Sequence, residues 1–149
     1  MSVTEELIRE EDVGCSELHE LIHRFDRDRG LLDRVGYTEE WSVKDMLAHL
    51  GSWCAEAVRA LEQIRMGTHE RVAVDVEAKN VEFHDTWKDV DVDTIRAEFF
   101  SARNRMLEEW GRLQDPNRLA QSWFRESGPK HYAEHLPRLR EWAEEVVPA

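Results

Sequence analysis

Apolar residues recur every three or four positions along several stretches of this chain, which is the spacing that places them on one face of an α-helix. We predict a first helix over roughly residues 4–29, with a weak point or bend at Gly14 and an end at Gly30. The apolar residues that follow the helical spacing most closely in this stretch are Leu18, Leu21, Ile22 and Phe25.

The second stretch is the clearest, because a start signal precedes its periodic run. Ser42 stands three residues before Asp45, which resembles the capping box that begins many helices. Gly67 follows the last apolar position and predicts an end near Met66. The apolar positions between these limits are Val43, Leu47, Leu50, Cys54, Ala57, Leu61 and Ile64. A stripe with this spacing is typical of a helix that packs in a bundle.

Two further helices are predicted in the second half of the chain. The third begins at Asp91 or Asp93, since aspartate suits the N-cap position. It stops before Asp115, because the residue that precedes a proline disfavours helix. The fourth begins near Pro129, which suits a first helical turn, and runs to about Val146.

The remaining segments are less regular. The stretch 72–87 favours either a helix or a long, partly helical crossover, and 116–129 is interpreted as a loop because a Gly-Pro step ends it. Pro137 falls inside the fourth helix, where a proline removes a backbone donor and tends to introduce a kink.

No useful length of the chain alternates apolar and polar residues, so no strand is predicted. The sequence therefore predicts an all-α fold with one domain over residues 1–149. Its architecture is a four-helix bundle with a longer, partly helical connection between the second and third helices.

Charge narrows the range of partners. The 149 residues carry a formal net charge of -12, and their basic residues are scattered among more numerous acidic ones. Nucleic-acid binding needs a basic surface, so we expect neither a nucleic-acid partner nor attraction to an anionic membrane. No apolar stretch approaches the roughly 20 residues that span a bilayer. Since residues 1–12 also lack the features of a secretory signal, we expect a cytoplasmic protein.

The two cysteines, Cys15 and Cys54, fall within helical patterns and have no CxxC spacing. In a cytoplasmic protein such residues are more often buried free thiols than a disulfide. The chain also has six tryptophans, a residue type that fills cores and lines apolar ligand pockets.

The candidate chemistry lies in the histidines. His131 and His135 are four residues apart, which on a helix places both imidazoles on one face with their Cβ atoms roughly 5–6 Å apart. A first-row metal ion bound by this pair needs a further ligand, and His49 at the edge of the second apolar stripe is the first candidate. His84 is the second candidate.

The structural alternatives for these histidines stay open at this point. Histidine pairs at this spacing occur by chance in many helices, so the pair alone does not establish a metal site. His19 and His23 have the same spacing in the first helix, but they stand among charged residues, and we interpret them as solvated surface.

Two runs together resemble the DinB-like superfamily: WSVKDMLAHLGSW at 41–53 and HYAEHLPRLREW at 131–142. They resemble most the subgroup of genotoxin self-protection proteins; other members are thiol-dependent transferases and a mycothiol-dependent maleylpyruvate isomerase. The resemblance implies a four-helix bundle that covers nearly the whole chain. It also implies a metal site formed by His49, His131 and His135.

Our first hypothesis is a metal-dependent enzyme that activates water or a low-molecular-weight thiol to attack an electrophilic or toxic compound. Imidazole suits zinc, nickel, iron and copper, and of these we expect zinc or nickel. Glu134 is the candidate base, Asn80 would orient a ligand, and we expect an apolar pocket to be lined by Trp53, Trp87 and Trp123.

Two other hypotheses belong to different functional classes. The tryptophan-rich cavity would hold a hydrophobic or DNA-damaging compound without turnover, or the protein would be a structural dimer whose histidine cluster is incidental. In the first two cases the partner is a small molecule, and a homodimer is possible in all three.

Overall fold

The computed structural model describes residues 2–148, and in that range the chain forms helices and turns but no strand. None of the described helices combines the length and the apolar character that crossing a membrane requires. The α-helices are α1 (Val3–Arg24), α2 (Val43–Met66), α3 (Val76–Trp87), α4 (Val92–Arg112), α5 (Arg118–Ser127) and α6 (Pro129–Val146). The predicted all-α class is confirmed.

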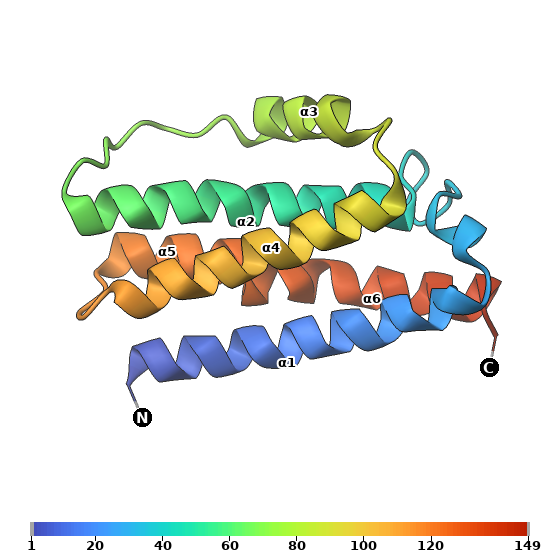
Figure 1. The fold of residues 1–149 in the computed structure, drawn as a ribbon, viewed down its shortest axis with the longest axis horizontal. Helices are drawn as coiled ribbons and strands as arrows, with labels where there is room; N and C mark the ends of the chain where they lie inside the picture. Colours follow the sequence, from blue (N-terminus) through green and yellow to red (C-terminus); the bar gives the residue numbers. More distant parts are fainter. Residues whose placement is uncertain (1, 149) are drawn as a thin grey trace.

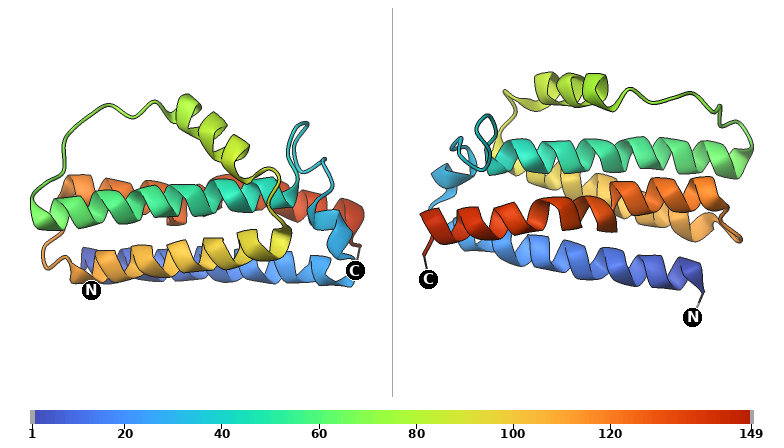
Figure 2. Two further views of the ribbon diagram at one scale, coloured as in Figure 1. Left: turned by 45° about the horizontal axis from the view of Figure 1, so that its top comes forward. Right: turned by 180° about the vertical axis from the view of Figure 1, so that it is seen from behind.

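Helices α1, α2, α4 and the consecutive pair α5–α6 run side by side along the long axis of the molecule and form a bundle (Figure 1). Helix α2 packs chiefly against α4, and α1 packs chiefly against α6. Helices α5 and α6 follow one another along one side of the bundle, so together they act as an interrupted fourth helix (Figure 2). Helix α3 lies outside this bundle against α2, within the predicted connection between the second and third long helices.

The predicted start signals are present as hydrogen bonds. Ser42 Oγ accepts from the backbone N–H of Asp45 at 3.1 Å, and the Asp45 carboxylate accepts from the Ser42 N–H at 2.9 Å, which completes the capping box of α2. At the start of α4, the Asp91 side chain accepts from the N–H of Thr94 at 3.1 Å. These contacts satisfy backbone donors that would otherwise be left without partners.

The interpretation of residues 116–129 as a loop is wrong, because ten of them form α5. Asn117 caps this helix by accepting a hydrogen bond from the N–H of Ala120 at 2.8 Å. Ala120 and Phe124, four residues apart, are both fully buried. The breaks at Pro116 and Gly128 lie so close together that they suggested a loop, yet a three-turn helix fits between them.

The first helix also differs from its prediction. It ends at Arg24, after which the chain makes two 3₁₀ turns over Phe25–Arg27 and Arg29–Leu32. Helix α1 runs without interruption through Gly14. A Cβ at Gly14 would lie 2.9 Å from Cδ2 of Tyr132, so the glycine allows α1 and α6 to approach closely.

Both cysteines are buried and unpaired, as predicted. Burial raises the pKa of the Cys15 thiol to about 11 and that of Cys54 to about 12. Because the thiolate is the reactive form, neither cysteine is a nucleophile at neutral pH.

A buried ion pair joins three of the helices. The Glu11 side chain of α1 is 0% exposed, and its carboxylate accepts two hydrogen bonds from Arg103 of α4, at 2.8 and 2.6 Å. Tyr132 of α6 donates a third hydrogen bond from its hydroxyl at 2.8 Å. Losing one member of such a buried pair leaves the other charge without a partner, which is strongly destabilising.

We expect Arg103→Ala to lower the free energy of unfolding by about 3–5 kcal/mol, because the Glu11 carboxylate then stays buried without its counter-charge. Urea unfolding followed by circular dichroism measures this change. Arg140→Ala is the matched control, since Arg140 also pairs with a glutamate of α1, Glu17, but on the surface, with side chains 48% and 38% exposed. Similar unfolding midpoints for the two variants would contradict a dominant role for the buried pair.

Candidate metal centre

The three predicted histidines meet between α2 and α6. His49 comes from the middle of α2, and His131 and His135 come from successive turns of α6. One ring nitrogen from each residue lies within 4.8 Å of the others. The Nε2 atoms of His49 and His131 are 2.8 Å apart. The prediction that these imidazoles converge is therefore confirmed, whereas their role as metal ligands stays a prediction.

Burial keeps these rings neutral at physiological pH. It lowers the pKa of His49 to about 4, with a smaller contribution from the charge of His135. It lowers the pKa of His131 to about 2, with smaller contributions from the other two rings. The pKa of His135 is lowered by burial as well. A neutral imidazole has a free lone pair, which is the form that binds metal ions.

A further residue, Tyr37, contacts the cluster and was missed by the sequence reasoning. Its side chain is only 1% exposed. Its hydroxyl lies 2.7 Å from Nδ1 of His135 and 3.4 Å from the backbone oxygen of the same residue. Nδ1 is thus engaged, so the Nε2 atom of His135 remains available to the cluster. Tyr37 lies in an irregular segment before α2, where no periodicity marks it as part of a site.

The loop that holds Tyr37 is itself anchored to α6. Arg138 donates to the backbone oxygen of Tyr37 at 2.6 Å and to that of Gly36 at 2.9 Å. Gly36 has a φ of 144°, and a Cβ at this position would overlap the ring of Trp142. Only glycine fits this turn, and the turn brings the tyrosine to His135.

The histidines open into a cavity of about 460 Å³. Four other predicted site residues line the same cavity, namely Trp53, Asn80, Trp123 and Glu134. The indole N–H of Trp53 donates to the side-chain oxygen of Asn80 at 2.8 Å, which ties α3 to α2 at the cavity wall. The structure therefore brings these residues together, although their roles stay predictions.

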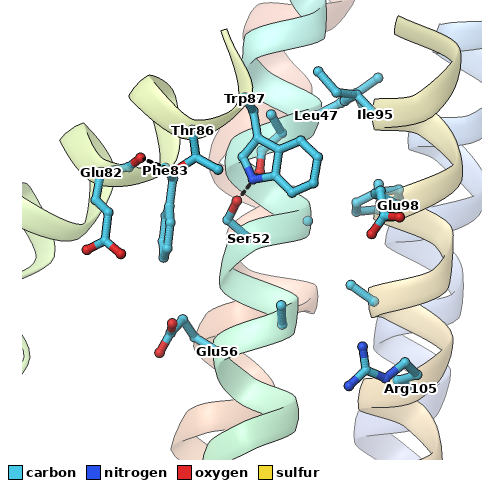
Figure 3. A pocket seen from close by; sticks show the side chains of 15 residues that line it. Leu47, Ser52, Glu56, Glu82, Phe83, Thr86, Trp87, Ile95, Glu98 and Arg105 are labelled. Carbon is cyan, nitrogen blue, oxygen red and sulfur yellow. Dashed lines mark hydrogen bonds between the residues drawn. The ribbon is translucent and has the colours of Figure 1, made fainter. Parts of the chain in front are cut away.

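Trp87 lies elsewhere, so its predicted place in the same pocket is not observed. It lines a separate cavity of about 260 Å³ between α2, α3 and α4, next to Phe83 and opposite Ile95 (Figure 3). Trp87 also borders a small cavity of about 10 Å³ with His49 and Asn80, but it does not line the larger cavity into which the three histidines open.

The other histidines do not join the cluster. The Nε2 of His84, the second candidate ligand, lies 3.7 Å from a carboxylate oxygen of Asp45, and its ring stacks on Trp41. His19 and His23 are exposed, as predicted, and His23 binds the carboxylate of Asp26 at 2.8 Å.

The donor set fits a divalent metal ion. Metal–imidazole bonds of about 2.0–2.1 Å allow two ligand atoms of one ion to lie up to about 4.2 Å apart, so small side-chain rotations suffice to bring the three nitrogens to one centre. His131 is 8% exposed, and its Nδ1 has no hydrogen-bond partner among the described residues. The polar contact of this ring is made on its Nε2 side, which faces the cluster.

The fold and the site together define a class: a helical bundle with a partly buried three-histidine cluster that opens into a cavity lined in part by tryptophan. Residues 14–148 match the family described as the mycothiol maleylpyruvate isomerase N-terminal domain, and the chain belongs to this family. The resemblance to the DinB-like superfamily is thereby confirmed. The closer resemblance to genotoxin self-protection proteins stays a prediction.

Comparison with solved structures supports the fold. The chain is similar to an uncharacterised protein from Escherichia coli UTI89, with a TM-score of 0.74 and 19% sequence identity, over 95% of this chain and 93% of that one. Comparison with curated protein sequences finds no match.

Proposed function

We propose that this protein is a metal-dependent enzyme that acts on an electrophilic small molecule. His49, His131 and His135 would hold one divalent ion, for which we expect zinc or nickel, two of the metals that imidazole donors suit. The observation that carries the proposal is the convergence of three imidazoles at the wall of a cavity that tryptophans also line. Membership of a family associated with metal-binding, mycothiol-related enzymes supports it.

The ion would supply one kind of chemistry: it lowers the pKa of water or a thiol that binds to it and so provides a nucleophile near neutral pH. The substrate would be attacked either by water, in a hydrolase, or by a low-molecular-weight thiol, in a transferase.

Tyr37 acts on the orientation of His135. When Nε2 of His135 is the ligand, the proton of the neutral ring lies on Nδ1, which donates to the Tyr37 hydroxyl oxygen at 2.7 Å. The Tyr37 hydroxyl then donates to the His135 backbone oxygen at 3.4 Å. Contacts of this kind fix the tautomer and the ring plane of a metal-binding histidine.

The cavity wall supplies binding and proton transfer. Trp53 and Trp123 contact the apolar part of a ligand and exclude water. Asn80, held by the Trp53 indole, orients a polar group of the ligand. Glu134 lines the cavity one residue before His135 and would accept a proton from the incoming nucleophile.

A sequestration protein is the second candidate, and one observation favours it. The Nε2 atoms of His49 and His131 lie at hydrogen-bond distance, so one ring donates to the other without an ion. In that case, the cavity would hold a hydrophobic or DNA-damaging compound between its tryptophans, and no turnover would follow.

Metal content tests the proposed ligands. We expect protein purified without a polyhistidine tag and reconstituted with zinc to hold about one ion per chain, measured by inductively coupled plasma mass spectrometry after gel filtration. His49→Ala should reduce this to well below half, since two imidazoles alone bind weakly. His19→Ala, which removes an exposed histidine, should retain the ion. A metal content near zero in the reconstituted wild type would exclude the metal-dependent mechanism.

Tyr37→Phe isolates the hydroxyl that contacts His135. We expect the zinc dissociation constant, measured by competition with a chromophoric chelator, to rise about 10–100-fold, because the ring of His135 is no longer held. The ring of phenylalanine keeps the packing, so the unfolding midpoint should change little by comparison. An unchanged zinc affinity would show that the tyrosine serves packing alone.

A turnover assay distinguishes the proposed enzyme from the alternative, a sequestration protein. The zinc-loaded protein is mixed with an epoxide or a chlorinated aromatic compound, with and without a low-molecular-weight thiol, and products are followed by mass spectrometry. Product that needs the thiol indicates a transferase, and product without it indicates a hydrolase. We expect a loss of at least about 100-fold in His49→Ala, since metal activation of the nucleophile is removed. Quenching of tryptophan fluorescence without product would favour sequestration.

A further inference from the structure

We infer that the histidine cavity takes a cationic ligand: an apolar molecule, aromatic or aliphatic, that carries a protonated amine. This inference rests on the proposed function, because it names the class of molecule that the same cavity would bind. The residues that carry it are side chains of the cavity wall other than the three histidines.

The first observation is the apolar character of the wall. Two indoles and three aliphatic side chains surround the cavity, which has room for a molecule of one or two rings. These residues are Trp53, Val74, Val76, Leu119 and Trp123. Flat indole faces bind apolar rings, and they also attract cations through the negative face of the ring.

The second observation is the sign of the charge at the cavity. Apart from the histidines, the ionisable side chains that line it within the described chain are two glutamates, Glu126 of α5 and Glu134 of α6. Neither lysine nor arginine contributes to this lining. With no metal ion at the histidines, an anionic ligand would therefore meet two carboxylates and no basic side chain of the lining. An ammonium group would gain from both.

The third observation is how α5 and α6 distribute their charges. Three of their basic side chains, Arg125, Lys130 and Arg140, line a different groove, the one against α1. Two glutamates of the same helices, Glu126 and Glu134, line the histidine cavity, whereas Glu141, Glu144 and Glu145 near the end of α6 lie outside it. Lys130 pairs with Glu126 at 3.0 Å but lies outside the cavity lining, whereas Glu134 has no ion-pair partner among the described residues. Glu134 is therefore the stronger candidate for the ammonium contact.

These placements orient the ligand. Glu134 lies on the same helix as His131 and His135 and within one turn of each, so an ammonium group bound there remains close to the histidines. The apolar body would then lie against Trp53 and Trp123. Charge, rather than shape alone, would decide which apolar molecules are admitted.

Three naphthalene probes that differ in one substituent test the inference: 1-naphthylmethylamine, 1-naphthylmethanol and 1-naphthoate. Dissociation constants are measured by isothermal titration calorimetry at pH 7.5 and low salt, on the zinc-free and the zinc-loaded protein. In the zinc-free protein we expect the amine to bind about 10-fold more tightly than the carboxylate, with the alcohol between them. Added salt should reduce the difference, because these carboxylates are exposed to solvent.

Glu134→Gln identifies the contact. We expect this substitution to weaken amine binding about threefold and to leave alcohol binding unchanged, in both forms of the protein. Glu144→Gln is the matched control, because Glu144 is an exposed glutamate of α6 outside the cavity lining, and it should alter none of the affinities. Glu126→Gln provides a second variant at the cavity, and circular dichroism verifies that all three variants are folded.

Two results would overturn the inference. One is a carboxylate probe that binds the zinc-free protein as tightly as the amine, and the other is an identical response of Glu134→Gln and Glu144→Gln. Since binding to the zinc-free protein needs no metal and no turnover, this failure is distinct from failure of the proposed function. If the protein binds no zinc but still prefers the amine probe, the inferred charge preference is supported and the metal-dependent mechanism is contradicted.

Discussion

The buried carboxylate of Glu11 is the interaction on which the arrangement of the helices depends. A charge in the core must be matched, and Arg103 of α4 and Tyr132 of α6 both contact it. The pair thereby fixes α1, α4 and α6 relative to one another. Tyr132 is the residue next to His131, so the rotation of α6 that satisfies Glu11 also directs His131 toward α2. The packing of the core and the position of His131 therefore depend on the same orientation of α6.

The cluster depends in turn on a second polar contact, made by a loop rather than a helix. Tyr37 contacts His135, and Arg138, one turn further along α6, holds the backbone of that loop. Helix α6 therefore provides two metal-binding candidates and also the anchor of the residue that orients one of them. Precise positions in binding sites generally require such supporting contacts, because an unsupported imidazole samples several rotamers.

The sequence predicted the helices whose signals are local. The capping box at Ser42, the aspartate cap of α4 and Pro129 at the start of α6 each act within one turn of the chain, and each helix begins there. Helix α5 was missed because its flanking breaks, Pro116 and Gly128, are stronger local signals than a short apolar pattern. The bend expected at Gly14 was wrong for a related reason: the need for that glycine comes from Tyr132, which is distant in sequence.

The site, like the helices, was predicted from the sequence where the signals are local and missed where they are not. The spacing of His131 and His135 is local, and their convergence with His49 was anticipated and is observed. Trp53 and Asn80 line the same cavity, while their roles stay predictions. Tyr37 was not anticipated, because its contact with His135 spans 98 residues and leaves no periodic pattern. Trp87 was misplaced because sequence distance along α3 does not show which of two neighbouring cavities a side chain enters.

Gly128 separates α5 from α6 on the fourth side of the bundle, and the two helices contribute different side chains to the cavity. The segment before it, α5, contributes Trp123 and Glu126 to the cavity wall, and the segment after it, α6, contributes His131 and His135. A continuous helix would couple these two sets of side chains through one rigid axis. With a glycine between them, substitutions in α5 can change the shape and charge of the cavity wall while the two histidines of α6 stay in place.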